Sequence, residues 1–101
     1  MLSTDEKQRL TDQLVAALAS EHEVCRIVIF GSFLHSDHPH DLDVAVFQDS
    51  DEPYLPLALK YRKKTRQIAR AIALDIIPVR AGQKDGLFLD EIEQGQVIYE
   101  R

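Results

Sequence analysis

Two short apolar segments separated by a polar loop constrain the fold of this chain more than any other feature. Residues 24–30 are mostly β-branched or aromatic and stop at Gly31, so they predict a buried strand rather than a helix. Residues 41–47 have strand character, with Leu42, Val44 and Val46 on one face and Asp41 and Asp43 on the opposite face of a second strand. A sheet is therefore expected, with a turn that begins at Gly31.

The other elements follow from spacing and from helix-start signals. Ser3 and Glu6 form a capping-box pattern ahead of a helix, and Pro78 suggests either an edge strand or the end of a strand. The expected elements are helices over residues 4–20 and 57–72, a strand over 74–79, a turn over 82–86, a short helix over 87–93 and a strand over 96–99. This order predicts an α/β (α+β) fold, with a small mixed β-sheet flanked by helices.

Length and composition limit the number of domains. The chain has 101 residues, of which 45% are hydrophobic and 29% are charged, values typical of a folded soluble protein rather than a disordered one. We expect residues 1–101 to form a single minimal domain.

Charge and cysteine content restrict the partners and the compartment. The formal net charge of −5 argues against a freestanding nucleic-acid binder. The single cysteine, Cys25, excludes an intrachain disulfide, the first residues are polar, and no apolar run is long enough to span a bilayer. A cytoplasmic protein without a membrane segment is expected.

Five residues form a pattern that points to phosphate chemistry. A strand that enters Gly31 and Ser32 lets the backbone approach a phosphate closely, and the serine adds a hydroxyl donor. Asp41 and Asp43 point the same way from one strand, where two like charges repel each other unless a cation neutralises them. Asp75, on the next predicted strand, supplies a third carboxylate.

These oxygen ligands suit magnesium. Mg²⁺ usually takes one or two carboxylates and completes its coordination shell with water and substrate phosphate oxygens. Two ions that clamp the attacking and leaving oxygens are the standard arrangement for in-line nucleotidyl transfer. In that arrangement Asp41 and Asp43 hold the metal of the nucleotide, and Asp75 helps to position and deprotonate an acceptor hydroxyl.

Simpler interpretations remain open for the same residues. Asp41 and Asp43 are also compatible with the solvent face of an edge strand, and Asp75 with a half-exposed residue at a strand start, paired with an arginine. The basic residues between Lys60 and Arg70 fit either a solvated helix face or a docking patch for an acidic protein, a triphosphate or RNA.

Three segments, IVIFGSF, DLDVAVF and LDIIPV, are together similar to the nucleotidyltransferase core of the DNA polymerase beta superfamily, in its minimal branch. The ending DEIEQGQVIYE also resembles that of the small members. The resemblance implies that Gly31 and Ser32 contact nucleotide phosphates and that Asp41, Asp43 and Asp75 bind magnesium. The implied reaction moves a nucleoside monophosphate, expected to be AMP from ATP, to a hydroxyl and releases pyrophosphate.

The resemblance also implies a biological setting. Small members often act as antitoxins paired with a HEPN-domain RNase toxin, and some modify a tyrosine of that toxin with AMP. A protein acceptor and a homo- or hetero-oligomer are therefore expected.

The segment between Ser32 and Asp41 departs from the family pattern. Eight residues separate Ser32 from Asp41, fewer than is usual, and Leu34, His35 and Ser36 replace the common small, basic and glycine residues after the serine. His40 also replaces the usual serine before the first aspartate. The alternative is a catalytically weak or inactive module of the same fold, which neutralises a partner by binding it.

Overall fold

The computed structural model describes residues 2–83 and 89–101. Four strands form one sheet in the order β3-β2-β1-β4. β1 runs antiparallel to both β2 and β4, whereas β2 and β3 are parallel. The elements in chain order are α1 (Thr4–Leu18), β1 (Val24–Phe30), the 3-10 helix η1 (Gly31–Leu34), β2 (Asp41–Gln48), α2 (Tyr54–Lys64), α3 (Arg66–Ala69), β3 (Ala73–Arg80), α4 (Leu89–Glu93) and β4 (Gln96–Glu100).

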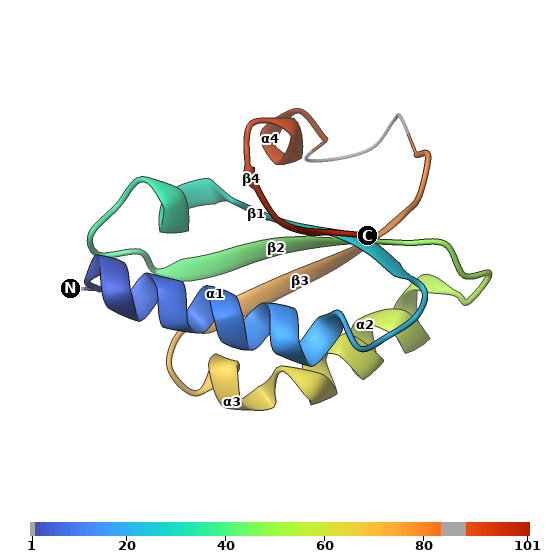
Figure 1. Cartoon of the computed structure of the whole chain (residues 1–101), viewed down its shortest axis with the longest axis horizontal. Helices are drawn as coiled ribbons and strands as arrows, with labels where there is room; N and C mark the ends of the chain where they lie inside the picture. Colours follow the sequence, from blue (N-terminus) through green and yellow to red (C-terminus); the bar gives the residue numbers. More distant parts are fainter. Residues whose placement is uncertain (1, 84–88) are drawn as a thin grey trace.

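The two faces of the sheet are covered unequally. α1, α2 and α3 lie on one face and α4 lies on the other (Figure 1). Alternation along β2 sends Leu42, Val44 and Val46 into the larger core under the three helices. Ala45 and Phe47 point the other way, into a smaller cluster that includes Ile92 of α4. The predicted mixed sheet flanked by helices is confirmed.

α1 forms as its sequence predicts. The Ser3 hydroxyl accepts from the backbone N–H of Glu6, and the Glu6 carboxylate accepts from the backbone N–H of Ser3, both at 3.1 Å. This reciprocal pair satisfies two helix-end donors that otherwise lack partners. The apolar stripe of the helix, Leu10, Leu14 and Leu18, is buried against the sheet.

The predicted single helix over residues 57–72 is wrong in its continuity. α2 ends at Lys64, and Thr65, at φ −107° and ψ 17°, separates it from α3. The Thr65 hydroxyl donates to the Tyr61 carbonyl at 2.8 Å, a side-chain bond that competes with regular helix hydrogen bonding. The face itself is correctly predicted, because its apolar positions are buried on both sides of the break.

The C-terminal elements match the expected order. β3 is the edge strand beside β2, and Pro78 lies within it, as its missing N–H allows. The predicted turn over residues 82–86 and the start of the helix over 87–93 fall partly on residues 84–88, outside the described residues. Among the helices of the described ranges, none has the length and apolar content to cross a membrane.

Candidate functional site

Pairing within the sheet brings the predicted site residues side by side. Phe30, which precedes Gly31, is in register with Asp43 on the antiparallel β2. Asp43 is in register with Asp75 on the parallel β3. Neighbouring strands lie about 4.8 Å apart, and registered residues point to the same side of the sheet. The glycine turn and two carboxylates therefore form one row across three strands.

Gly31 is required here by space as well as by backbone conformation. Its φ is +82°, in the left-handed region that favours glycine. A Cβ atom at this position would lie only 2.5 Å from Oδ2 of Asp43. The backbone of the turn thus approaches the carboxylate more closely than any other residue type allows.

Ser32 lies in the first turn of η1, with its side chain exposed. Its carbonyl accepts from the backbone N–H groups of His35 at 3.1 Å and Ser36 at 2.9 Å, which fixes the turn. Within residues 2–83 and 89–101, the Ser32 hydroxyl has no hydrogen-bond partner. This donor is available to a ligand beside the row of carboxylates.

Negative charge is concentrated around Asp43. Burial raises the pKa of Asp43 above its ordinary value, and the charges of Asp75, Asp41 and Glu91 raise it further. Like charges at this spacing oppose ionisation unless a cation is bound. The half-buried Asp43 is therefore the electrostatic centre of the group.

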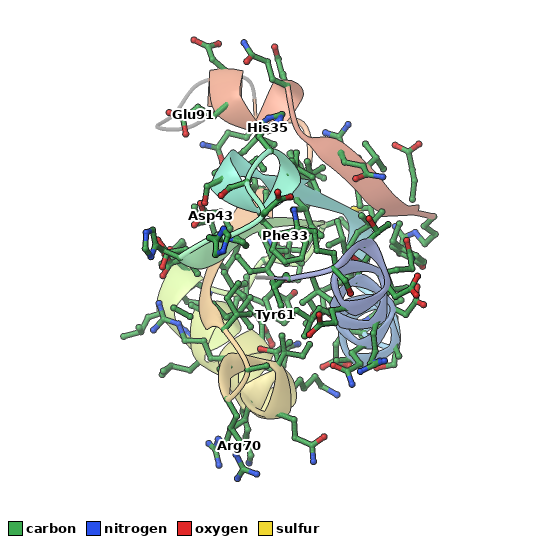
Figure 2. The ribbon with its side chains drawn as sticks, turned by 90° about the vertical axis from the view of Figure 1, so that its left-hand side faces the viewer. Phe33, His35, Asp43, Tyr61, Arg70 and Glu91 are labelled. Atoms are coloured by element: carbon green, nitrogen blue, oxygen red, sulfur yellow. The ribbon has the colours of Figure 1, made fainter. Side chains whose placement is uncertain are left out.

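The structure adds residues that sequence analysis missed. A cleft of about 310 Å³ is lined by Asp43 and Asp75 together with Tyr54 and Arg62 of α2 and Glu91 of α4. Figure 2 shows the side chains of Asp43 and Glu91 on the same side of the molecule. The sequence shows that α4 begins with acidic residues. That Glu91 lies in the same cleft as Asp43 depends on the tertiary fold.

The predicted carboxylates differ in their surroundings. The side chain of Asp75 is exposed, because β3 is an edge strand. In the described part of the chain, neither Asp43 nor Asp75 forms an ion pair. Asp41 lies two residues before Asp43 on β2, where it is in register with Ala73. It does not line the cleft.

The donor set fits a magnesium ion held jointly with a substrate. Across the described ranges, no three His, Cys, Asp or Glu side chains are arranged to hold an ion by themselves. The two adjacent carboxylates of Asp43 and Asp75 nevertheless match the one or two protein ligands that Mg²⁺ usually takes. Phosphate oxygens and water would complete the shell.

Size alone does not mark this site. A cavity of about 490 Å³ opens between Arg26, Val28 and Glu93, on the face of the sheet that carries α4. It contains none of the predicted site residues. The cleft beside Asp43 is smaller, but Asp43 and Asp75 line it together with Phe30, the residue before the glycine turn; Gly31 and Ser32 themselves are not part of its lining.

A family model described as "Polymerase beta, Nucleotidyltransferase" matches residues 12–101. The chain belongs to this family. The match includes both strands that carry the predicted aspartates and the turn at Gly31. A search of curated protein sequences found no significant match.

Solved structures of similar fold support the family assignment. A chain in the complex of the tri-AMPylated Shewanella oneidensis HEPN toxin with the MNT antitoxin matches with a TM-score of 0.63 and 15% identity, over 94% of this chain and 73% of that chain. A chain in the toxin-antitoxin complex MntA-HepT matches with a TM-score of 0.60 and 16% identity, over 93% of this chain and 73% of that chain. At such identities the similarity establishes the nucleotidyltransferase fold.

Proposed function

We propose that this chain is a magnesium-dependent nucleotidyltransferase that moves AMP from ATP to a hydroxyl on a HEPN-domain partner protein, and that it thereby acts as an antitoxin. The observation that carries the proposal is the row formed by Asp43 and Asp75 on adjacent strands and by Gly31 at the end of β1. A close backbone approach next to two carboxylates that form no ion pair with the described residues suits a metal-bound triphosphate.

The residues divide into two roles. Gly31 and Ser32 bind phosphate oxygens, because the glycine leaves space and the free serine hydroxyl donates a hydrogen bond. Asp43 and Asp75 hold one Mg²⁺, and Asp41 adds a carboxylate from the same strand for the same ion or a second one. Bound magnesium would neutralise the triphosphate charge and stabilise the charge that develops on transfer.

The reaction is an in-line displacement. The acceptor hydroxyl oxygen forms a bond to the α-phosphorus of ATP, the bond from that phosphorus to the bridging oxygen breaks, and pyrophosphate leaves. The exposed carboxylate of Asp75, at the open edge of the sheet, accepts the proton of the hydroxyl. The product is a phosphodiester between AMP and the acceptor side chain.

The identity of the acceptor is supported by the similar structures. Both contain toxin-antitoxin complexes, and in one the HEPN toxin is described as tri-AMPylated. A protein hydroxyl as acceptor and AMP as the transferred group are consistent with this description. We infer that this chain forms a complex with a HEPN-domain protein.

The test uses the full chain, its HEPN-domain partner, ATP and Mg²⁺, with intact-mass measurement of the partner. The partner should gain the mass of one or more AMP groups. Asp43→Asn should remove this gain, because a metal ligand is lost, whereas Asp51→Asn, at an exposed residue before α2, should retain it.

Neutralisation without mass gain would contradict the proposed transfer. In that case the wild-type chain would block the RNase activity of the partner equally well with and without ATP. The non-catalytic binding module would then be the correct function.

A further inference from the structure

The basic residues of α2 fall into two groups with different surroundings. Lys60 Nζ lies 2.8 Å from the carboxylate of Glu23, and Lys64 Nζ lies 3.8 Å from that of Glu21, so this side of the helix is tied to the connection between α1 and β1. The side chain of Arg62 forms no hydrogen bond or ion pair with any part of the chain that the structure describes. Only the first group has a structural role in the fold.

The free side of α2 also carries large apolar side chains. Tyr54, Leu55 and Leu59 are 55%, 60% and 55% exposed. Leu55, Leu59 and Arg62 follow one another at intervals of four and three residues, which places them on one face of the helix. Clustered exposed aromatic and leucine side chains beside arginine are typical of protein interfaces rather than of a free surface.

This face is continuous with the proposed transfer site. Tyr54 and Arg62 line the same cleft as Asp43 and Asp75. The sheet order places β3 and Gly31 on opposite sides of Asp43, and α2 packs on the β3 side. The glycine turn thus lies at one end of the row of carboxylates and α2 at the other.

We propose that Tyr54, Leu55, Leu59 and Arg62 form an acceptor-docking face, on which the acceptor-bearing segment of the partner protein lies with its hydroxyl directed toward Asp75. This inference rests on the proposed function and names the surface that selects its acceptor. Apolar side chains of the segment pack on the two leucines. An acidic group of the segment pairs with Arg62.

Charge determines the kind of occupant that this face accepts. Arg62, Lys63 and Arg66 have no ion-pair partner among the described residues, so they complement acidic groups on a protein segment. The phosphate backbone of a nucleic-acid strand would leave the exposed side chains of Leu55 and Leu59 without an apolar partner. An acidic peptide with apolar side chains satisfies both the leucines and the free cations.

The test measures the KM for the partner and the KM for ATP separately, with matched variants on other surfaces. Arg62→Glu is compared with Arg70→Glu, because Figure 2 places Arg70 at the end of the molecule opposite Glu91. Leu59→Ser is compared with Val97→Ser, at an exposed residue of β4. Binding of the partner is also measured by calorimetry in the Asp43→Asn background, where transfer is disabled.

Arg62→Glu and Leu59→Ser should each raise the KM for the partner, and its Kd, by about tenfold or more. Leu59→Ser, at a residue outside the lining of the cleft, should also leave the KM for ATP within about twofold of wild type. The two controls should change neither value. If the wild-type chain transfers no AMP while these variants still bind the partner more weakly than the controls do, the proposed transfer fails and the docking face stands.

Two results would overturn the docking face. One is an equal partner affinity for the test and control variants, with transfer intact. The other is a change only in self-association, measured by sedimentation, which would assign the face to a second copy of this chain.

Discussion

Gly31 and Gly82 share an unusual backbone but differ in what surrounds them. Their φ angles are +82° and +84°, so a side chain is strained at either position. A Cβ on Gly31 would meet the carboxylate of Asp43, whereas a Cβ on Gly82 would meet nothing within 4 Å. Substitution of Gly82 therefore tests backbone strain alone, whereas substitution of Gly31 tests strain together with displacement of the Asp43 carboxylate.

Gly31→Ala and Gly82→Ala should each lower the free energy of unfolding by about 1–2 kcal/mol, measured by urea denaturation. Only Gly31→Ala should also reduce nucleotide transfer, by about tenfold or more, because Asp43 must move. If the Gly31→Ala variant transfers AMP as fast as the Gly82→Ala variant, the close approach of Gly31 to Asp43 has no role in transfer.

Glu23 holds the connection before β1 to α2. It is 4% exposed and accepts hydrogen bonds from Lys60 Nζ and from the Tyr61 hydroxyl, each at 2.8 Å. Burial alone would raise the pKa of Glu23, but the bonds from Lys60 and Tyr61 outweigh it, and the pKa lies below its ordinary value. A lowered pKa means that the ionised carboxylate stabilises the fold.

Glu23→Gln should lower the free energy of unfolding by about 1.5–3 kcal/mol at pH 7. The stabilisation is fully present above the unfolded-state pKa of about 4.3. It is lost as the pH falls through the lower folded-state pKa, so the difference between wild type and variant should shrink in acid. Glu52→Gln, at a carboxylate 3.8 Å from the same lysine and 53% exposed, serves as the control and should have little effect. A difference that persists at the lowest pH would contradict the assigned role.

At the scale of elements, α1 supports the loop that links the glycine turn to β2. The backbone N–H of Leu2 donates to the carbonyl of Asp37 at 2.9 Å, and Lys7 Nζ donates to the carbonyl of Ser36 at 2.7 Å. The same ammonium lies 5.4 Å from the ring centre of Phe33. Residues at and before the start of α1 thus hold the short loop after Ser32 in place.

Lys7→Met should lower the free energy of unfolding by about 0.5–1.5 kcal/mol and raise the KM for ATP, because the turn that we propose to bind phosphate loses its support. Arg9→Met, on the exposed side of the same helix, is the control for both measurements. An unchanged KM for ATP, together with the expected loss of stability, would limit Lys7 to a structural role.

The predictions from sequence succeeded where local patterns determine structure. The period-two alternation of residues 41–47 placed Asp41 and Asp43 on one face, and the capping pair fixed the start of α1. The break at Thr65 was missed. The spacing of apolar residues along this segment is the same for one continuous helix as for two helices that pack against one core. α2 ends next to Thr65, whose hydroxyl donates a hydrogen bond to the carbonyl of Tyr61.

At the scale of the whole molecule, the row of carboxylates follows from long-range pairing. The parallel register of Asp43 with Asp75 joins two strands that are separated by α2 and α3, and no local pattern specifies such a register. The sequence pattern grouped Asp75 with Asp41 and Asp43 and placed it on the next strand, but it did not predict this register. The positions of Arg62 and Glu91 beside the row depend on how helices pack on each face, so the sequence did not predict them.

The most direct measurement of the central claim is a transfer assay with ATP labelled at the α-phosphate, run in parallel with ATP labelled at the γ-phosphate. With Mg²⁺, the wild-type chain should transfer the α label, but not the γ label, to its HEPN-domain partner. Removal of Mg²⁺ by a chelator, Asp43→Asn or Asp75→Asn should each reduce the transfer by at least about a hundredfold. Transfer of the γ label, or α-label transfer that persists in both variants, would contradict the account.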